Sequence, residues 1–278
     1  MTDSLDTRAQ SHTIDLPAGR FHYLSWGDER TELPSVLLLH GITSSAQSWV
    51  RVGPELANRY RVYALDMRGH GESPKPSAGA YSLRHTADDA AAFMEVLNLE
   101  RPVVIGHSWG GATALVLASG AGSQTPVPAF SHVILEDPAH NLSRSNAEGR
   151  AAFYTQDIGR PAQELRVEIA ASSPGWTEAD IEGKINALQQ VSREAVISVF
   201  SEAGAAGDLL PLLATIAAPT LLIRADATLG TTMNATDWEQ AQHYLPSHSR
   251  AVEIHGATHN IHRSTFDAFM REVNNFLS

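Results

Sequence analysis

The stretch of sequence that decides the fold is Gly106-His107-Ser108-Trp109-Gly110. It lies between the apolar run of residues 102–105 and the small and aliphatic residues 111–118, which are compatible with a helix. A G-x-S-x-G sequence between a buried strand and a helix holds its serine on a sharp, strained turn, and only glycine fits on either side. The pattern therefore predicts that Ser108 is a nucleophile whose hydroxyl points outward.

Short runs of Val, Ile and Leu recur along the chain with helical stretches between them, which is typical of a parallel sheet covered on both faces. We expect strands at residues 21–26, 36–40, 62–66, 103–105, 133–135, 220–224 and 251–254. Most of these runs are apolar without alternation, so both faces of the sheet should be buried. The sequence predicts an α/β fold with a doubly wound, mostly parallel sheet.

One segment interrupts the alternation of strands and helices. Residues 83–97 show the apolar spacing of a core helix, whereas residues 141–213 contain helical patterns at 177–190 and 193–202 without a convincing strand. We expect a core domain of residues 1–140 and 214–278, interrupted by a helical cap at residues 141–213.

Composition narrows the classes of function. The formal net charge of −11 argues against a nucleic-acid or anionic-membrane partner, because such surfaces require positive charge. No apolar run reaches the roughly 18 residues of a membrane span, and the acidic start does not resemble a signal peptide, so we expect a cytoplasmic protein. The sequence has no cysteine, which excludes disulfides, thiolate metal sites and a cysteine nucleophile.

A serine hydroxyl needs a neighbouring base to become a nucleophile. Of the 13 histidines, His259 is the best placed, because it follows the strand at 251–254 and precedes a helix at 266–277. His259 and His262 could share one helical turn, but no nearby ligand completes a metal site, so we predict no metal. We expect His107 to pack against the sheet or to steer a neighbouring group.

The third partner of such a site is a carboxylate that orients the histidine. Asp226 follows the strand at 220–224, and Glu136 and Asp137 follow the strand at 133–135. Both strands should end at the same edge of the sheet. Only one loop can supply the acid that contacts the histidine. The acid in the other loop should cap a helix or pair with an arginine such as Arg224.

Acyl transfer also needs two backbone N–H groups directed at the developing oxyanion. Trp109 follows the nucleophile and supplies one. Because Gly41 allows the backbone to bend after the strand at 36–40, we expect the amide of Ile42 to supply the other. These two amides are the predicted oxyanion hole.

Taken together, these residues resemble the α/β-hydrolase fold family along nearly the whole chain. The motifs that follow the family order are His40-Gly41, residues 66–73 (DMRGHGES), residues 106–111 (GHSWGG) and Gly256-Ala257-Thr258-His259. The resemblance implies the doubly wound sheet, the helical cap, and a catalytic triad that begins with Ser108 and ends with His259.

The sequence departs from the family at the acid. Members usually carry it after the penultimate strand in a Gly-x-x-Asp pattern, but Thr228 stands at that position and Asp226 lies two residues earlier. Some members take the acid from the preceding strand, where Asp137 lies. The resemblance therefore favours Asp137, with Asp226 as the alternative and Glu136 as the third candidate.

The leading functional hypothesis is a serine hydrolase that cleaves an ester, lactone or amide of a small molecule through an acyl-enzyme, without a cofactor. The resemblance also allows a carbon–carbon bond hydrolase, a lyase or a cofactor-independent oxygenase, or a ligand receptor without activity. Dehalogenases and epoxide hydrolases are disfavoured, because their nucleophile is an aspartate where Ser108 stands. The sequence indicates no oligomeric state.

Overall fold

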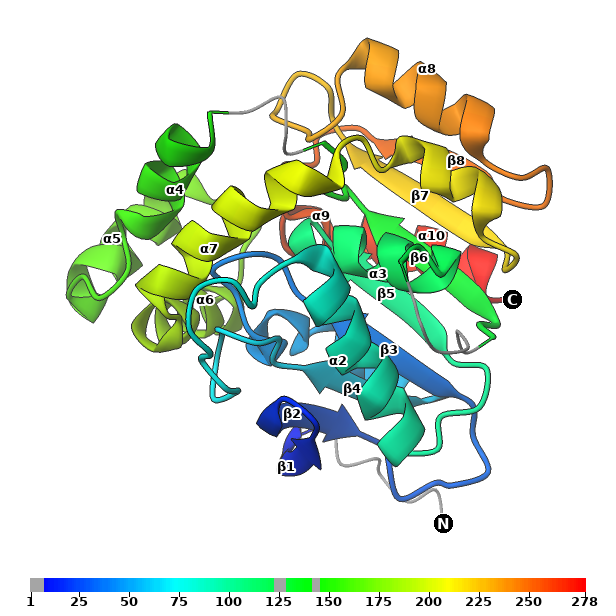
Figure 1. The fold of residues 1–278 in the computed structure, drawn as a ribbon, viewed down its shortest axis with the longest axis horizontal. Helices are drawn as coiled ribbons and strands as arrows, with labels where there is room; N and C mark the ends of the chain where they lie inside the picture. Colours follow the sequence, from blue (N-terminus) through cyan, green and yellow to red (C-terminus); the bar gives the residue numbers. More distant parts are fainter. Residues whose placement is uncertain (1–7, 123–128, 142–145) are drawn as a thin grey trace.

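The computed structural model describes residues 8–122, 129–141 and 146–278. An eight-stranded sheet, in the order β1-β2-β4-β3-β5-β6-β7-β8, runs through its centre (Figure 1). The strands are β1 Gln10–Leu16, β2 Gly19–Trp26, β3 Ser35–Leu39, β4 Arg61–Leu65, β5 Val103–His107, β6 His132–Glu136, β7 Thr220–Ala225 and β8 Arg250–Ile254. β1 and β2 pair antiparallel with their neighbours, and all other pairs are parallel. The mostly parallel sheet predicted from the sequence is thus confirmed.

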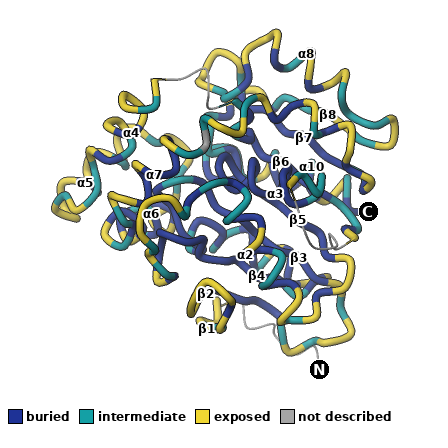
Figure 2. Tube along the Cα trace, viewed as in Figure 1, coloured by how far each residue is buried: buried dark blue, intermediate teal, exposed yellow. Residues whose placement is uncertain are grey.

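Two apolar cores cover the two faces of this sheet. Along β3, Leu37 and Leu39 point into one core and Val36 and Leu38 into the other, because successive side chains alternate between faces. Each such fully buried side chain contributes about 1.5–3 kcal/mol of burial free energy. Figure 2 shows the central strands as the most completely buried part of the molecule.

Helices supply the outer layer of each core. The first core packs against α2 Leu83–Val96, α3 Trp109–Ser119, α8 Ala235–Tyr244 and the short η3 Leu210–Thr215. The second packs against η1 Ala46–Trp49, α1 Val52–Leu56, α9 Ile261–Ser264 and α10 Phe266–Phe276. The sheet is therefore doubly wound.

Four more helices and a short turn lie between β6 and β7 and gather on the left of Figure 1. They are α4 Ala147–Thr155, α5 Ala162–Ser172, α6 Glu178–Gln190, α7 Arg193–Ala203 and η2 Gly204–Ala206. Leu165 of α5 and Ile181, Ile185 and Leu188 of α6 form a separate small core. Asn141 and Asp208 form a β-bridge, so this segment leaves and rejoins the rest of the chain side by side.

Five of the described α-helices, α2, α4, α6, α7 and α8, begin after a residue whose side chain accepts from a backbone N–H of the first turn. Ser82 accepts from the His85 N–H at the start of α2, and Thr177 and Asp180 form a reciprocal capping box at the start of α6. Each such cap satisfies N–H groups that have no partner within the helix. These polar residues set the boundaries between loop and helix.

Several elements were not predicted individually from the sequence, among them β1, α1, α8 and α9. β1 is an edge strand with mostly exposed or half-exposed residues, so it lacks the apolar run that marks the central strands. α8 presents only a narrow buried face around Ala241 and is otherwise polar, which weakens its helical pattern. No helix in the described ranges combines the length and hydropathy of a membrane span.

Candidate active site

Ser108 lies on the turn between β5 and α3, in a strained backbone conformation with φ 53° and ψ −113°. Glycine on both sides is a steric requirement: a Cβ on Gly106 would clash with the Gly110 carbonyl, and one on Gly110 with the Leu39 carbonyl. A left-handed φ is costly for a residue with a Cβ and is held here by the packed strand and helix. The turn presents the serine hydroxyl at the carboxyl end of the central strand.

Three predicted site residues, Ser108, His259 and Asp137, form one hydrogen-bonded chain. His259 Nδ1 lies 2.6 Å from Asp137 Oδ2, and His259 Nε2 lies 2.9 Å from Ser108 Oγ. Because a carboxylate only accepts, Nδ1 carries the proton and donates to Asp137, and Nε2 accepts from the serine hydroxyl. In this tautomer the imidazole is placed to remove the hydroxyl proton.

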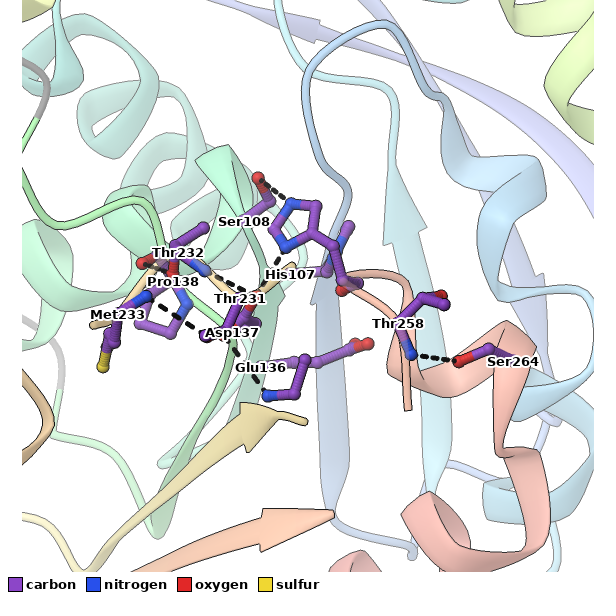
Figure 3. Close-up of polar contacts among 12 residues, drawn as sticks. His107, Ser108, Glu136, Asp137, Pro138, Thr231, Thr232, Met233, Thr258 and Ser264 are labelled. Carbon is purple, nitrogen blue, oxygen red and sulfur yellow. Dashed lines mark hydrogen bonds and ion pairs between the residues drawn. The ribbon is translucent and has the colours of Figure 1, made fainter. Parts of the chain in front are cut away.

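Asp137 is completely buried and is held by groups from β7 and the loop that follows it. Thr231 Oγ1 donates to Oδ1 at 2.6 Å, the Thr232 N–H donates to Oδ2 at 3.1 Å, and the Ala225 N–H reaches Oδ1 at 3.4 Å (Figure 3). A buried carboxylate is costly unless it is hydrogen-bonded. With His259, these donors satisfy the buried carboxylate and fix it in position.

Asp226, the alternative acid, directly follows β7 and makes its described hydrogen bonds within nearby loops. Its carboxylate accepts from the Gly256 N–H at 2.8 Å and from Thr228 Oγ1 at 2.7 Å. The Gly256 N–H, followed by the two donors of Thr228, lowers the pKa of Asp226 to about 2. Asp226 thus caps a loop, and no hydrogen bond joins it to His259 in the described residues.

Glu136, the third candidate acid, contacts a different histidine. It is fully buried, and it accepts from the His262 N–H at 2.9 Å and from His262 Nδ1 at 2.8 Å. Its side chain leaves β6 on the side opposite to Asp137, as alternation at the end of the strand predicts. The Glu136–His262 pair anchors the turn that carries His259.

His107 steers a neighbour, as the sequence suggests. Its Nε2 donates to the His259 carbonyl at 3.0 Å, and its ring packs against the His259 ring with centroids 4.8 Å apart. Burial lowers the pKa of His107 well below its usual value, so the ring is neutral at pH 7. His107 holds the backbone of the histidine loop.

Ile42, Ser108 and Trp109 line the same small cavity of about 30 Å³. Its other lining residues are Ala139, Arg150, Tyr154, Val199, Phe200 and Thr232. In the part of the chain that the structure describes, neither the Ile42 N–H nor the Trp109 N–H donates to a protein acceptor. No acceptor among the described residues therefore competes for these two N–H groups.

A residue of α6, in the helical segment α4 to α7, makes hydrogen bonds to the loop that carries Ile42. Lys184 of α6 donates from Nζ to the Thr43 carbonyl and to Thr43 Oγ1, both at 2.8 Å. Thr43 itself has a left-handed φ of 55°. Burial, and after it the charge of Arg263, lowers the pKa of Lys184 to about 7.

A larger open groove of about 690 Å³ adjoins the small cavity. It lies between α4, which supplies Arg150, Phe153 and Tyr154, and the loops that supply Thr231, Thr232 and His259. Arg150, Tyr154 and Thr232 line both spaces. A ligand in the groove can thus reach Ser108.

Three residues that contribute to this site were missed from the sequence. Thr231 and Thr232 follow the strand where the family usually places its acid, so donors to a carboxylate could have been sought there. Lys184 lies on the apolar stripe of α6, three residues after Ile181 and four before Leu188. A lysine on an apolar stripe is a signal of a buried polar contact.

No cluster of three or more His, Asp or Glu side chains that could hold a metal ion occurs within residues 8–122, 129–141 and 146–278. His262, which the sequence places within reach of His259, donates instead to Glu136.

Comparison with known proteins gives matches in sequence and in structure. A family model described as the alpha/beta hydrolase fold matches residues 34–163. Epoxide hydrolase 3 of Xenopus tropicalis is 33% identical over 145 residues, which are 52% of this chain and 35% of that protein. The chain thus spans about a third of the length of this curated relative.

Solved structures match over nearly the full length. The crystal structure of an E-2-(acetamidomethylene)succinate hydrolase superposes with a TM-score of 0.80 at 19% identity, covering 97% of this chain and 99% of the other. The N-formylmaleamic acid deformylase of Pseudomonas putida S16 gives a TM-score of 0.75 at 26% identity, covering 95% and 100%.

Proposed function

This chain belongs to the α/β-hydrolase fold family, and on that premise we propose that it is a serine hydrolase of small-molecule esters, lactones or amides. The observation that carries the proposal is the hydrogen-bonded chain from Ser108 through His259 to Asp137. Its nucleophile, base and carboxylate come from three different strand ends and meet at one edge of the sheet.

The first half of the reaction acylates the enzyme. His259 Nε2 takes the hydroxyl proton as Ser108 Oγ attacks the substrate carbonyl, and Asp137 stabilises the resulting imidazolium. The N–H groups of Ile42 and Trp109 donate to the oxyanion, a contribution of about 3–4 kcal/mol for each donor. The tetrahedral intermediate collapses when His259 returns its proton to the leaving alcohol or amine.

The second half releases the acid. A water molecule gives its proton to His259 and attacks the acyl carbonyl, and the same two amides hold the second oxyanion. Breakdown of this intermediate returns the proton to Ser108 Oγ and frees the carboxylic acid product. The reaction requires the substrate, water and these side chains only.

The nucleophile separates this proposal from the epoxide hydrolase to which half of the chain is similar. An alkoxide with a histidine base suits attack on a carbonyl, because the acyl-enzyme it forms is an ester that activated water cleaves. Amide cleavage has support from the deformylase, whose full length this chain matches. Esters and lactones need the same sequence of steps.

We also propose that helices α4 to α7 act as the cap over the active site. They bring Arg150, Tyr154 and Phe200 to the cavity beside Ser108, and the groove between α4 and the His259 loop opens to solvent. A groove of this size suits a small organic molecule.

The test is covalent labelling by a fluorophosphonate together with turnover of 4-nitrophenyl esters. We expect the label on Ser108, and we expect Ser108→Ala to abolish labelling and turnover while keeping the wild-type melting temperature. Ser119→Ala, on the same helix, is the matched control and should behave as wild type. Unchanged ester turnover in Ser108→Ala would overturn the proposal.

A further inference from the structure

Arg150 occupies a position that the proposed chemistry does not use. It lies on the exposed side of α4 and lines both the small cavity at Ser108 and the open groove beside His259. Tyr154, four residues later, shares its face of the helix and lines the same two spaces. Both residues therefore border the space that a ligand beside Ser108 would occupy.

Other arginines of the helical segment already have acceptors. Arg160 pairs with Asp157 at 2.5 Å and with Glu168 at 2.8 Å, and Arg166 pairs with Glu178 and Glu182. Arg193 donates to the Ile158 carbonyl at 3.3 Å. Arg144, a further arginine that the sequence places here, lies outside the described residues.

Arg150 differs from these arginines, because its guanidinium has no hydrogen-bond acceptor and no ion-pair partner among the residues that the structure describes. The described walls of both spaces contain no Asp or Glu. The guanidinium keeps this free position although the sequence has 31 acidic and 20 basic residues. A carboxylate of a ligand in the groove would therefore meet this guanidinium without competition from an acidic side chain of the described walls.

Aromatic residues beside Arg150 would strengthen the attraction between its guanidinium and a bound anion. Aromatic rings of Phe153, Tyr154 and Phe200 form the nearby walls, and Tyr154 stacks on Phe200 with centroids 5.2 Å apart. Burial raises the pKa of Tyr154, and the charge of Arg150 opposes that rise, which places the guanidinium within electrostatic reach of the phenol. A bound ligand would displace water from Arg150 against these rings and strengthen the charge interaction.

We propose that Arg150 binds a carboxylate of the substrate, so that the enzyme acts on small esters, lactones or amides that carry a second, unreactive carboxylate. This inference rests on the proposed function for the reacting bond, but the anion site itself does not. A guanidinium fork matches a carboxylate in a bidentate arrangement, and the Tyr154 hydroxyl on the same helix face can add a third donor.

The test compares two substrates that differ in this charge alone. Mono-4-nitrophenyl adipate carries a free carboxylate, and 4-nitrophenyl hexanoate has the same acyl chain length without it. We expect wild-type enzyme to prefer the adipate half-ester. We expect Arg150→Met to lower kcat/KM for the half-ester by roughly 10- to 100-fold, the value of a charged hydrogen bond, mostly through KM, and to leave the hexanoate unchanged.

Two further variants sharpen the result. Arg193→Met removes another guanidinium of the helical segment that lines neither space, and it should leave both substrates at wild-type values. Arg150→Lys keeps the charge without the fork and should recover part of the lost activity on the half-ester. Equal losses on both substrates in Arg150→Met, or no wild-type preference for the half-ester, would overturn the proposal.

A binding measurement separates this proposal from the proposed function. Calorimetric titration with adipate should show binding to wild type and to Ser108→Ala but not to Arg150→Met. If neither ester is hydrolysed and adipate still binds through Arg150, the hydrolase proposal fails and the anion site stands. If both esters are hydrolysed and adipate does not bind, the anion site fails and the hydrolase proposal stands.

Discussion

Asp137 is held in the left-handed region, with φ 39°, and its side chain is fully buried. Aspartate and asparagine tolerate this backbone conformation better than most residues with a Cβ. The strained turn directs the carboxylate toward His259, and four donors fix it there. The backbone conformation and the side-chain hydrogen bonds thus both direct the Asp137 carboxylate toward His259.

Asp137→Asn keeps the size and the favourable backbone of this residue and removes its charge. We expect kcat for ester hydrolysis to fall by roughly 10⁴-fold, because the amide no longer fixes the productive tautomer of His259. The measurement is steady-state turnover of a 4-nitrophenyl ester at pH 8, with the melting temperature recorded alongside.

Asp226→Asn is the matched control for this substitution. Its carboxylate accepts from Gly256 and Thr228 and has no bond to His259, so kcat should stay at the wild-type value. A large loss of kcat in Asp226→Asn, with none in Asp137→Asn, would contradict the proposal. The acid would then be Asp226, after β7, and not Asp137, after β6.

At the scale of elements, α6 is tied to the loop between β3 and η1. Lys184 makes both of its described hydrogen bonds to Thr43, which follows the residue proposed to donate to the oxyanion. Gly183 of the same helix packs closely on Gln47 of η1, which directly follows that loop. The helical segment α4 to α7 therefore supports this loop through α6.

Lys184→Met retains the length of the side chain and removes both hydrogen bonds. We expect kcat for a neutral ester to fall by up to about 100-fold, the lower end of the cost of losing an oxyanion donor, with KM little changed. Lys75→Met, at the only other lysine of the sequence, is the control and should keep wild-type kcat. An unchanged kcat in Lys184→Met would show that the loop holds its shape without the lysine.

At the scale of the whole molecule, buried histidines make the fold sensitive to acid. Burial lowers the pKa of His40, of His107 and of His262, and burial together with the charge of His40 lowers that of His70 to about 3. His40 Nε2 accepts the Met67 N–H at 3.0 Å, so protonation there breaks a backbone contact.

The stability of the protein should therefore fall as the pH falls. The unfolded chain binds protons on these histidines near pH 6.5, whereas folded His70 stays neutral until about pH 3, so the unfolded state binds more protons in between. Each such histidine contributes a slope of up to about 1.4 kcal/mol per pH unit. Urea unfolding at a series of pH values between 7 and about 4 measures the effect.

A variant pair isolates one histidine of this set. His70→Gln should show a shallower loss of stability with acid than wild type, and His248→Gln, at an exposed position, should show the same slope as wild type. A stability that is independent of pH over this range would contradict the assignment of neutral buried histidines.

Local patterns in the sequence determined most of the fold. The apolar strands, the parallel sheet, the glycine-flanked turn at Ser108 and the loop position of His259 all depend on residues that are close together in the chain. Elements without a local pattern were not predicted. An example is the exposed edge strand β1, which is stabilised by pairing with β2 and has no apolar face of its own.

The tertiary structure decided which carboxylate meets His259. That contact joins residues 122 positions apart, and the Ser108–His259 contact joins residues 151 apart, so no local pattern contains either. From the sequence alone, Asp137, Asp226 and Glu136 all follow strands that end at one edge. Only the turn at Asp137, the capping bonds of Asp226 and the pairing of Glu136 with His262 separate them, because side-chain direction at a strand end is set by packing between distant segments.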